Sequence, residues 1–174
     1  MKKSTSKYIF SFGAPFALIP LDFIHDWFGA TGLDGEQYET LLQILESLEL
    51  DFESYNIINC EIDDIYLTIF DNSSNIYKIS DKKLFQLEYI NQGVDFSEIK
   101  MNPPILKKTI KVNIQKGTYA LFDSACEFSD LKTEENYFII KIDSNITHVV
   151  VSYHNSTHYS GWDIELKANL RDIS

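Results

Sequence analysis

The stretch GTYALFDSAC, from Gly117 to Cys126, sets Asp123, Ser124 and Cys126 within four residues, and enzymes use such side chains as nucleophiles. A serine nucleophile on a strand-to-helix elbow needs a glycine two positions away on each side, because the strained turn brings other backbone close. Phe122 and Cys126 occupy those two positions. The elbow signature is therefore absent, and the pattern favours an Asp-Ser pair that bonds nearby backbone where a strand ends.

Three histidines, His148, His154 and His158, are the other candidates for chemistry, either as metal ligands or as a base for Ser124. Histidines four positions apart bind zinc best on a helix, where both lie on one face. The segment from His154 to His158 has the composition of a polar turn instead, and the chain has no CxxC pair. We therefore predict no catalytic residue, no metal and no cofactor. A small hydrolase or metal-dependent enzyme that uses Ser124 or these histidines is the alternative.

Acidic side chains are concentrated in one part of the chain. The formal net charge is −11, and the segment between Lys7 and Lys78 contains 13 acids and no Lys or Arg. Asp63 and Asp64 within it are interpreted as a turn between strands, because turns favour Asp. The remaining acids repel one another, so their concentration predicts an electronegative face for a basic partner, with a merely solvated surface as the alternative. The same charge argues against nucleic acid and anionic membranes as partners.

Strands must position most of these residues, because the 12 Phe and 10 Tyr accompany many Ile and Val, which pack well on a pleated sheet. Two short strands are expected within 7–20, bent at Gly13 to Pro15. Alternation and turn signals predict further strands at 57–62, 65–70, 76–79, 84–90, 109–114, 118–122, 137–142, 146–153 and 162–168. Short turns at 115–117 and 143–145 predict two hairpins, and 130–136 is expected to be a polar loop.

One amphipathic helix is predicted in the first half of the chain. Asp34 is its expected cap, with Gln37 three positions later in a capping-box arrangement. Apolar residues then recur at helical spacing and are expected to face a core; they are Tyr38, Leu41, Leu42, Leu45 and Leu48. The preceding segment, 21–32, is expected to form an aromatic turn or a single helical turn.

These elements predict a mainly β (α+β) fold: an antiparallel β-sandwich or a partly open barrel with one N-terminal amphipathic helix. The 174 residues suit a single domain, 1–174. Two β-rich halves, 1–92 and 105–174, joined by a linker near 93–104, are the alternative arrangement. No apolar run is long enough to span a membrane, and the two cysteines indicate no disulfide framework, so a cytoplasmic location is expected.

Three motifs, FGAPFALIP, DWFGATG and GTYALFDSA, occur in an order that resembles the immunity protein 21 family of bacterial polymorphic-toxin systems. The residues that carry this resemblance are Gly13, Pro15, Pro20, Trp27, Gly29, Gly117, Phe122, Asp123, Ser124 and Ala125. The resemblance implies a non-enzymatic protein that binds and neutralises a cognate protein toxin.

The acidic segment suggests where such a toxin would bind. A nuclease is the toxin type that best suits an acidic inhibitor, because a site that holds phosphate is basic. The predicted contacts are the acids of the helix and its flanks, Asp34, Glu36, Glu39, Glu46, Glu49, Asp51 and Glu53. A β-sandwich module that binds carbohydrate or peptide, with Trp27 and Trp162 as stacking surfaces, is a third hypothesis. The sequence leaves the oligomeric state open.

Overall fold

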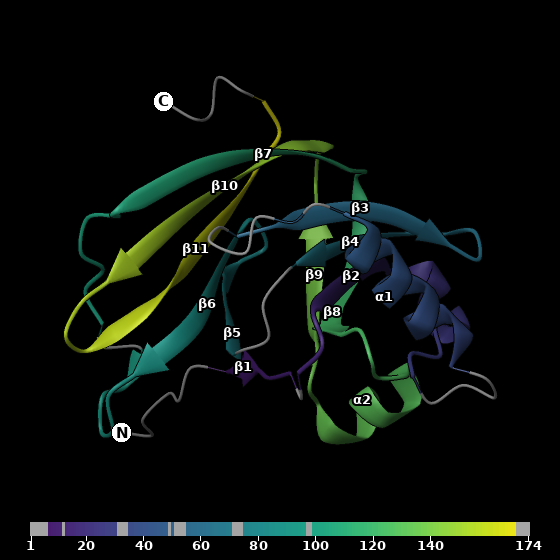
Figure 1. Ribbon diagram of the computed structural model, residues 1–174, viewed down its shortest axis with the longest axis horizontal. Helices are drawn as coiled ribbons and strands as arrows, with labels where there is room; N and C mark the ends of the chain where they lie inside the picture. Colours follow the sequence, from purple (N-terminus) through teal and green to yellow (C-terminus); the bar gives the residue numbers. More distant parts are fainter. Residues whose placement is uncertain are drawn as a thin grey trace.

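The computed structural model describes residues 7–11, 13–30, 35–48, 50, 55–70, 75–96 and 99–169. Two antiparallel β-sheets pack against each other, and helices lie on the outer face of the smaller sheet (Figure 1). This arrangement confirms the predicted mainly β class and its sandwich-like layering.

The larger sheet has six strands, in the order β1 (Tyr8–Ile9), β5 (Asn75–Ser80), β6 (Lys83–Ile90), β11 (Tyr159–Lys167), β10 (Ile146–Asn155) and β7 (Leu106–Ile114). The smaller sheet has five, in the order β3 (Ile57–Ile62), β4 (Ile65–Phe70), β2 (Phe16–Pro20), β8 (Gly117–Asp123) and β9 (Phe138–Ile142). Strand positions therefore follow the predicted ones closely. The bend between β1 and β2 contains Gly13 at φ 122°, a conformation that glycine adopts without steric cost.

The two predicted hairpins are wrong. β7 belongs to the six-stranded sheet and β8 to the five-stranded sheet, and the same division separates β10 from β9. Each short connection is thus a corner between sheets, and the Lys116 amide, which donates to Asn145 Oδ1 at 2.8 Å, ties the two corners together. A corner satisfies the apolar faces as well as a hairpin does, because all four strands contribute residues to the core between the sheets.

Two hydrophobic layers hold this architecture. The first lies between the sheets and includes Phe16, Phe70, Leu121 and Ile164. The second lies between the smaller sheet and the helices and includes Ile19, Phe122 and Leu41. Strands β2 and β8 contribute to both layers, which explains why their sequences are apolar almost throughout.

Three helical segments of the described chain cover the smaller sheet: two match the helical turn expected within 21–32 and the predicted amphipathic helix, and the third was not predicted. They are the 3₁₀ helix η1 (Leu21–Asp26), α1 (Glu36–Ser47) and α2 (Phe128–Glu134). The expected polar loop at 130–136 is therefore largely helical, and it buries Leu131 in the second layer. The predicted capping box is also wrong: the N-cap of α1 is Gly35 in the left-handed region, without a side-chain cap, and Asp34 lies outside the described residues.

The segment around 93–104 packs on the outer face of the larger sheet. Phe96 stacks on Tyr77 with ring centroids 4.0 Å apart, and Asn102 binds His154 and Tyr159. Each sheet contains strands from both sides of this segment, so it does not divide the sheets into an N-terminal and a C-terminal half. Among the described residues, no helix is long and apolar enough to cross a membrane.

Candidate functional site: an acidic end covered by helices

Helix α1 is held in place by a buried glutamine. The Gln37 side chain donates to the Asp26 carbonyl oxygen at 3.0 Å and accepts from the Phe28 amide at 2.8 Å. These bonds satisfy backbone groups just beyond η1, and Leu41, one turn further on, is fully buried. The contacts fix which face of α1 points inward, so the opposite face must point outward.

Acidic side chains occupy the outward face. Glu36, Glu39 and Glu46 are exposed, as predicted for a partner-binding helix. The other four predicted contacts, Asp34, Glu49, Asp51 and Glu53, lie outside the described residues. The sequence prediction missed neighbouring acids that lie on other elements.

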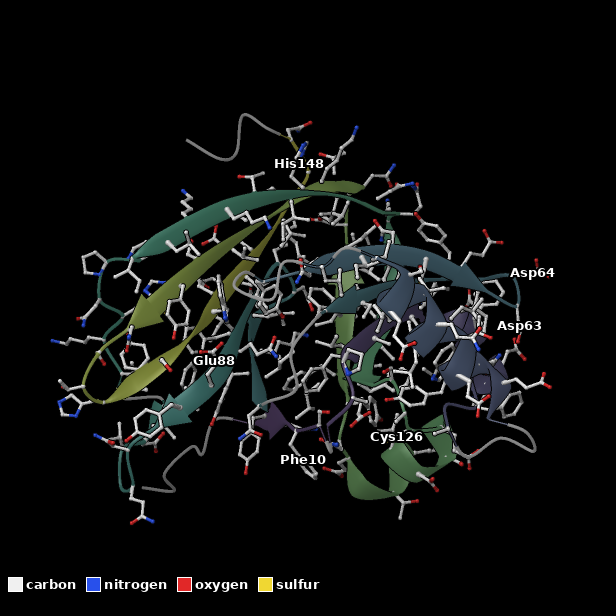
Figure 2. The ribbon with its side chains drawn as sticks, viewed as in Figure 1. Phe10, Asp63, Asp64, Glu88, Cys126 and His148 are labelled. Atoms are coloured by element: carbon white, nitrogen blue, oxygen red, sulfur yellow. The ribbon has the colours of Figure 1, made fainter. Side chains whose placement is uncertain are left out.

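Two of these neighbours are Asp22 and Asp26 on η1, and two are Asp63 and Asp64 at the β3–β4 turn. Both residues of the turn have positive φ, 50° and 63°, which confirms the predicted turn. Figure 2 shows the turn at the same end of the molecule as α1, and α1 contacts β3. We call this surface the acidic end; its members are Asp22, Asp26, Glu36, Glu39, Glu46, Asp63 and Asp64.

None of these acids forms an ion pair with another residue that the structure describes. The reason lies in the sequence, which places no Lys or Arg between Lys7 and Lys78. Mutual repulsion among these carboxylates destabilises the folded chain, and ion pairs would offset that cost. The approach of a basic surface therefore lowers the electrostatic free energy of the acidic end.

Large apolar side chains are exposed beside the acids: Phe23 at 42%, Phe28 at 49%, Leu42 at 37% and Leu48 at 40%. The prediction that Leu42 and Leu48 face the core is wrong, and helical geometry gives the reason. Leu42 points about 100° away from the buried Leu41, and Leu48 is the C-cap, where extended backbone ends the helical period. Ile44 packs against the core instead. The sequence could not show this, because Leu42 lies about 40° from Tyr38 on the helix and so within the apolar stripe. No sequence signal marks Phe23 or Phe28 as exposed either.

Beneath the acidic end, residues of the three sequence motifs meet in a junction, which consists of the buried Trp27, Gly29 and Ser124 and the half-buried Pro15 and Ala125. Trp27 Nε1 donates to the Ser124 carbonyl oxygen at 3.0 Å, and the Ser124 amide donates to the Pro15 carbonyl oxygen at 3.0 Å. Gly29, at φ +58°, lies so close to Ala125 that a Cβ would come within 2.4 Å of the Ala125 carbonyl oxygen. The junction therefore requires glycine at this position.

The other motif residues surround the junction in β2 and β8. Phe122 is buried in the second layer, and Pro20 pairs with Tyr119 in the ladder that joins the two strands. Asp123 is buried, and its Oδ1 accepts from the Ala125 amide at 2.9 Å. This bond agrees with the interpretation of Asp123 as a strand-end residue. Burial, and after it the charge of Asp123, raises the pKa of Tyr38 on α1.

The structure does not bring the candidate catalytic residues together. Ser124 is fully buried, its Oγ has no hydrogen-bond partner, and no hydrogen bond joins it to a histidine within the described chain. His148 bonds Thr147, and His154 bonds the Asn102 carbonyl oxygen at 2.7 Å. Figure 2 shows His148 well separated from Cys126, which lies two residues after Ser124. A search of the described residues finds no group of three or more His, Cys, Asp or Glu placed to hold a metal.

The two tryptophans expected to stack on a carbohydrate or peptide are both buried. Trp27 is 1% exposed in the junction, and Trp162 is 6% exposed between the sheets, where its Nε1 donates to Glu88. Cys60 and Cys126 are half-buried against the second layer, and burial raises the pKa of the Cys60 thiol to about 11.

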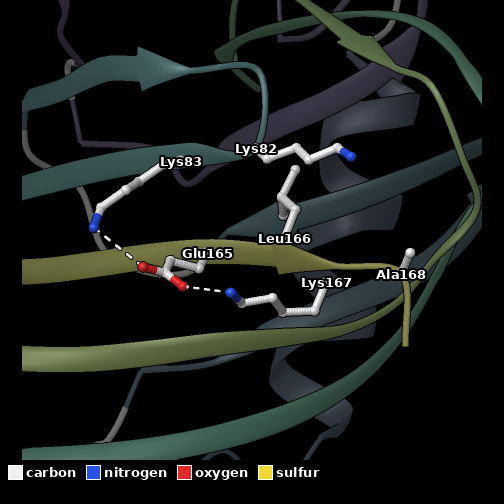
Figure 3. A pocket seen from close by; sticks show the side chains of 6 residues that line it. All are labelled: Lys82, Lys83, Glu165, Leu166, Lys167 and Ala168. Atoms are coloured by element: carbon white, nitrogen blue, oxygen red, sulfur yellow. Dashed lines mark hydrogen bonds and ion pairs between the residues drawn. The ribbon is translucent and has the colours of Figure 1, made fainter. Parts of the chain in front are cut away.

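A contrasting group of charges lies on the larger sheet, around a shallow pocket of about 340 Å³ (Figure 3). We call it the charged network; its members are Lys83, Asp163, Glu165 and Lys167. Lys83 Nζ lies 3.0 Å from Asp163 Oδ2 and 3.1 Å from Glu165 Oε1, and Lys167 lies 2.8 Å from the other Glu165 oxygen. Lys82, which also lines the pocket, pairs with Asp143 at 2.8 Å. These lysines are already neutralised, which disfavours an anion site there.

The pKa values of Asp163 and Lys83 in the charged network are both raised, for different reasons. Burial raises the pKa of Asp163 despite the opposing bond to Lys83. Burial lowers the pKa of Lys83, but its bonds to Asp163 and Glu165 outweigh that effect and raise it. The two causes reflect the different exposure of the side chains: Asp163 is 11% exposed, so burial dominates its pKa, and Lys83 is 35% exposed, so its ion pairs together dominate. The pair favours the ammonium without fully offsetting the desolvation of the carboxylate.

Comparison with models of known protein families, with curated proteins and with solved structures finds no match to this chain. The class of this protein is therefore described from its fold and its candidate site alone. The chain is a mainly β protein of two antiparallel sheets, with helices and unpaired acids at one end.

Proposed function

We propose that this chain is an immunity protein that binds a cognate bacterial protein toxin in the cytoplasm and neutralises it by stoichiometric occlusion. The observation that carries the proposal is the acidic end, where exposed carboxylates without ion-pair partners among the described residues share η1 and α1 with exposed apolar side chains. The order of the sequence motifs, which resembles the immunity protein 21 family, supports the same class.

Charge and apolar surface contribute differently to such binding. Unpaired carboxylates steer a basic partner toward the acidic end and speed association, but solvated charges add little affinity. Large apolar groups that become buried supply most of the binding free energy. Phe23, Phe28 and Leu42 provide such groups near the acids in the sequence, a composition that suits a protein surface better than a small cation.

The toxin that fits has a basic surface around its active or binding site. Nucleases meet this condition because they hold phosphate, so we propose a nuclease-type toxin as the partner. Occlusion requires only that the acidic end covers that basic surface. No catalytic residue, metal or cofactor of this chain takes part in the proposed mechanism.

Growth rescue tests the proposal. A nuclease-type toxin domain found in the neighbourhood of this gene would be expressed in a sensitive host, with and without this chain. The wild type is expected to restore growth, and Glu36→Lys with Glu39→Lys is expected to abolish the rescue because it reverses the charge of the contact face. Asp143→Lys is the control, since this exposed acid lies at the β9–β10 turn, outside the acidic end.

Binding of the purified toxin domain, measured by titration calorimetry, separates two possible failures. Rescue that survives the double reversal, with unchanged affinity, would contradict the acidic end as the contact surface. Absence of both binding and rescue with the wild type would contradict the immunity function itself.

A further inference from the structure

The open edge of β7 is a second candidate interaction surface, separate from the acidic end. β7 is the last strand of the larger sheet, and among the residues that the structure describes it pairs with β10 alone. From Leu106 to Lys111 this pairing runs in unbroken register, Leu106 opposite Tyr153 and Lys111 opposite His148. In an antiparallel ladder, alternate residues direct their amide and carbonyl groups away from the neighbouring strand. This part of β7 therefore offers a regular row of backbone donors and acceptors.

Other sheet edges are shorter or are closed by side chains. β1 contains two residues. On β9, Lys78 Nζ donates to the Ile139 carbonyl oxygen at 2.6 Å, and the Lys141 amide donates to Asp81 Oδ1 at 3.2 Å. The C-terminal part of β7 itself meets β3, where the Asn113 amide donates to Asn59 Oδ1 at 2.8 Å. Closure of this kind is how proteins prevent unwanted strand pairing.

The side chains along the open part of β7 specify a partner. Ile105 and Leu106 are 66% and 43% exposed. Lys107 and Lys111 are exposed on the face that points away from the core, and neither forms an ion pair with a residue that the structure describes. Because they are separated by four strand positions, the two lysines lie about 13 Å apart on one face.

A second copy of this chain is disfavoured at the edge in the register centred on Thr109. Two β7 strands that pair antiparallel about Thr109 would place Lys107 of each copy opposite Lys111 of the other. Like charges directly opposite each other destabilise a strand pair. The lysines therefore disfavour self-association in this register and favour a strand that carries acids at these positions.

We propose that the open edge of β7 accepts an extended segment of a partner protein as a further strand, with carboxylates four residues apart opposite Lys107 and Lys111. Backbone hydrogen bonds would hold the segment, and the paired charges would set its register. Apolar side chains of the segment would cover Ile105 and Leu106. This proposal uses neither the acidic end nor the proposed toxin contact.

A charge-swapped pair of chains tests the edge without knowledge of the natural partner. The variant Lys107→Glu with Lys111→Glu carries the complementary acids at the required spacing. Sedimentation velocity is expected to show a heterodimer when this variant is mixed with the wild type, while each protein alone stays monomeric. Raising the ionic strength from about 0.1 M to about 1 M, which shortens the screening length from about 10 Å to about 3 Å, is expected to dissociate it.

The matched control is Lys132→Glu with Lys141→Glu, which makes the same charge change on α2 and β9. A synthetic peptide, Glu-Val-Thr-Val-Glu-Val-Ile, provides a second probe. It is expected to shift the amide resonances of 106–111, and its lysine counterpart is expected to leave them unchanged. The proposal is overturned if the control variant associates with the wild type equally well. It is also overturned if neither the complementary chain nor the acidic peptide binds at β7. Either result leaves the acidic end untouched.

Discussion

The junction and the acidic end lie at the same end of the molecule and differ in almost every physical respect. Trp27, Gly29 and Ser124 are buried: Trp27 Nε1 donates to the Ser124 carbonyl oxygen, and Gly29 lies against the Ala125 backbone. Glu36, Glu39 and Glu46 are exposed and unpaired among the described residues. The motif residues thus determine the fold of this end, whereas the acids contribute little to folding and remain available to a partner. The sequence motifs and the proposed binding surface are therefore different parts of this protein.

The largest expected effect comes from breaking the junction. Gly29→Ala places a Cβ against the Ala125 backbone and forces a left-handed conformation on alanine. Overlap and conformation together are expected to lower the free energy of unfolding by about 3 kcal/mol. Urea unfolding followed by circular dichroism measures this change.

Gly35→Ala is the matched control, because Gly35 has nearly the same φ, +61°, and its Cβ would come no closer than 3.4 Å to the Ala30 carbonyl oxygen. It isolates the conformational cost of about 1 kcal/mol. Equal losses in the two variants would show that Gly29 does not pack against Ala125 as described.

The sequence predicted strand positions far better than strand partners. The alternation of Ile110, Val112 and Ile114 located β7, because period-two burial is a local property. It could not show that β7 leaves β8 at a corner, since Tyr119 and Leu121 of β8 face the same core from the other sheet. Pairing depends on which distant strand lies alongside, and short polar turns serve hairpins and corners equally.

The sequence likewise predicted part of the candidate site, the acids of α1, but not which other elements lie beside them. The absence of bases between Lys7 and Lys78 identified α1 as an acidic helix, because unpaired like charge must be solvated. It did not reveal that η1 and the β3–β4 turn bring further acids to the same end. Their meeting depends on tertiary contacts such as the bond from Gln37 to Asp26, and these leave no periodic trace.

A smaller effect is expected from Asp163, which tests what burial does to an acid. Its folded-state pKa is raised, so its contribution to stability is present below the unfolded pKa and is lost as the pH rises through the folded value. Ionised Asp163 therefore costs stability at neutral pH. As the pH is raised from 3 to 7, Asp163→Asn is expected to gain stability relative to the wild type. The gain should be less than about 1 kcal/mol, and the variant does not leave Lys83 unpaired because the ion pair of Lys83 with Glu165 remains. Urea unfolding at several pH values checks this, and a relative loss with rising pH would mean that Lys83 outweighs burial.

The smallest change in stability is expected from neutralising acids of the acidic end, and this variant tests most directly whether the acidic end is separate from the junction. Glu36→Gln with Glu39→Gln keeps the shape of the acidic end and removes two unpaired charges, so the free energy of unfolding should change by less than about 0.5 kcal/mol. Glu165→Gln is the control from the charged network, and it should destabilise by about 1 kcal/mol because it removes the partner of Lys83 and Lys167. If neutralising the α1 acids cost more than the Glu165 change, these acids would be structural, and the separation between junction and acidic end would fail. If stability is unchanged while toxin association slows and loses its dependence on salt, the acids serve recognition alone.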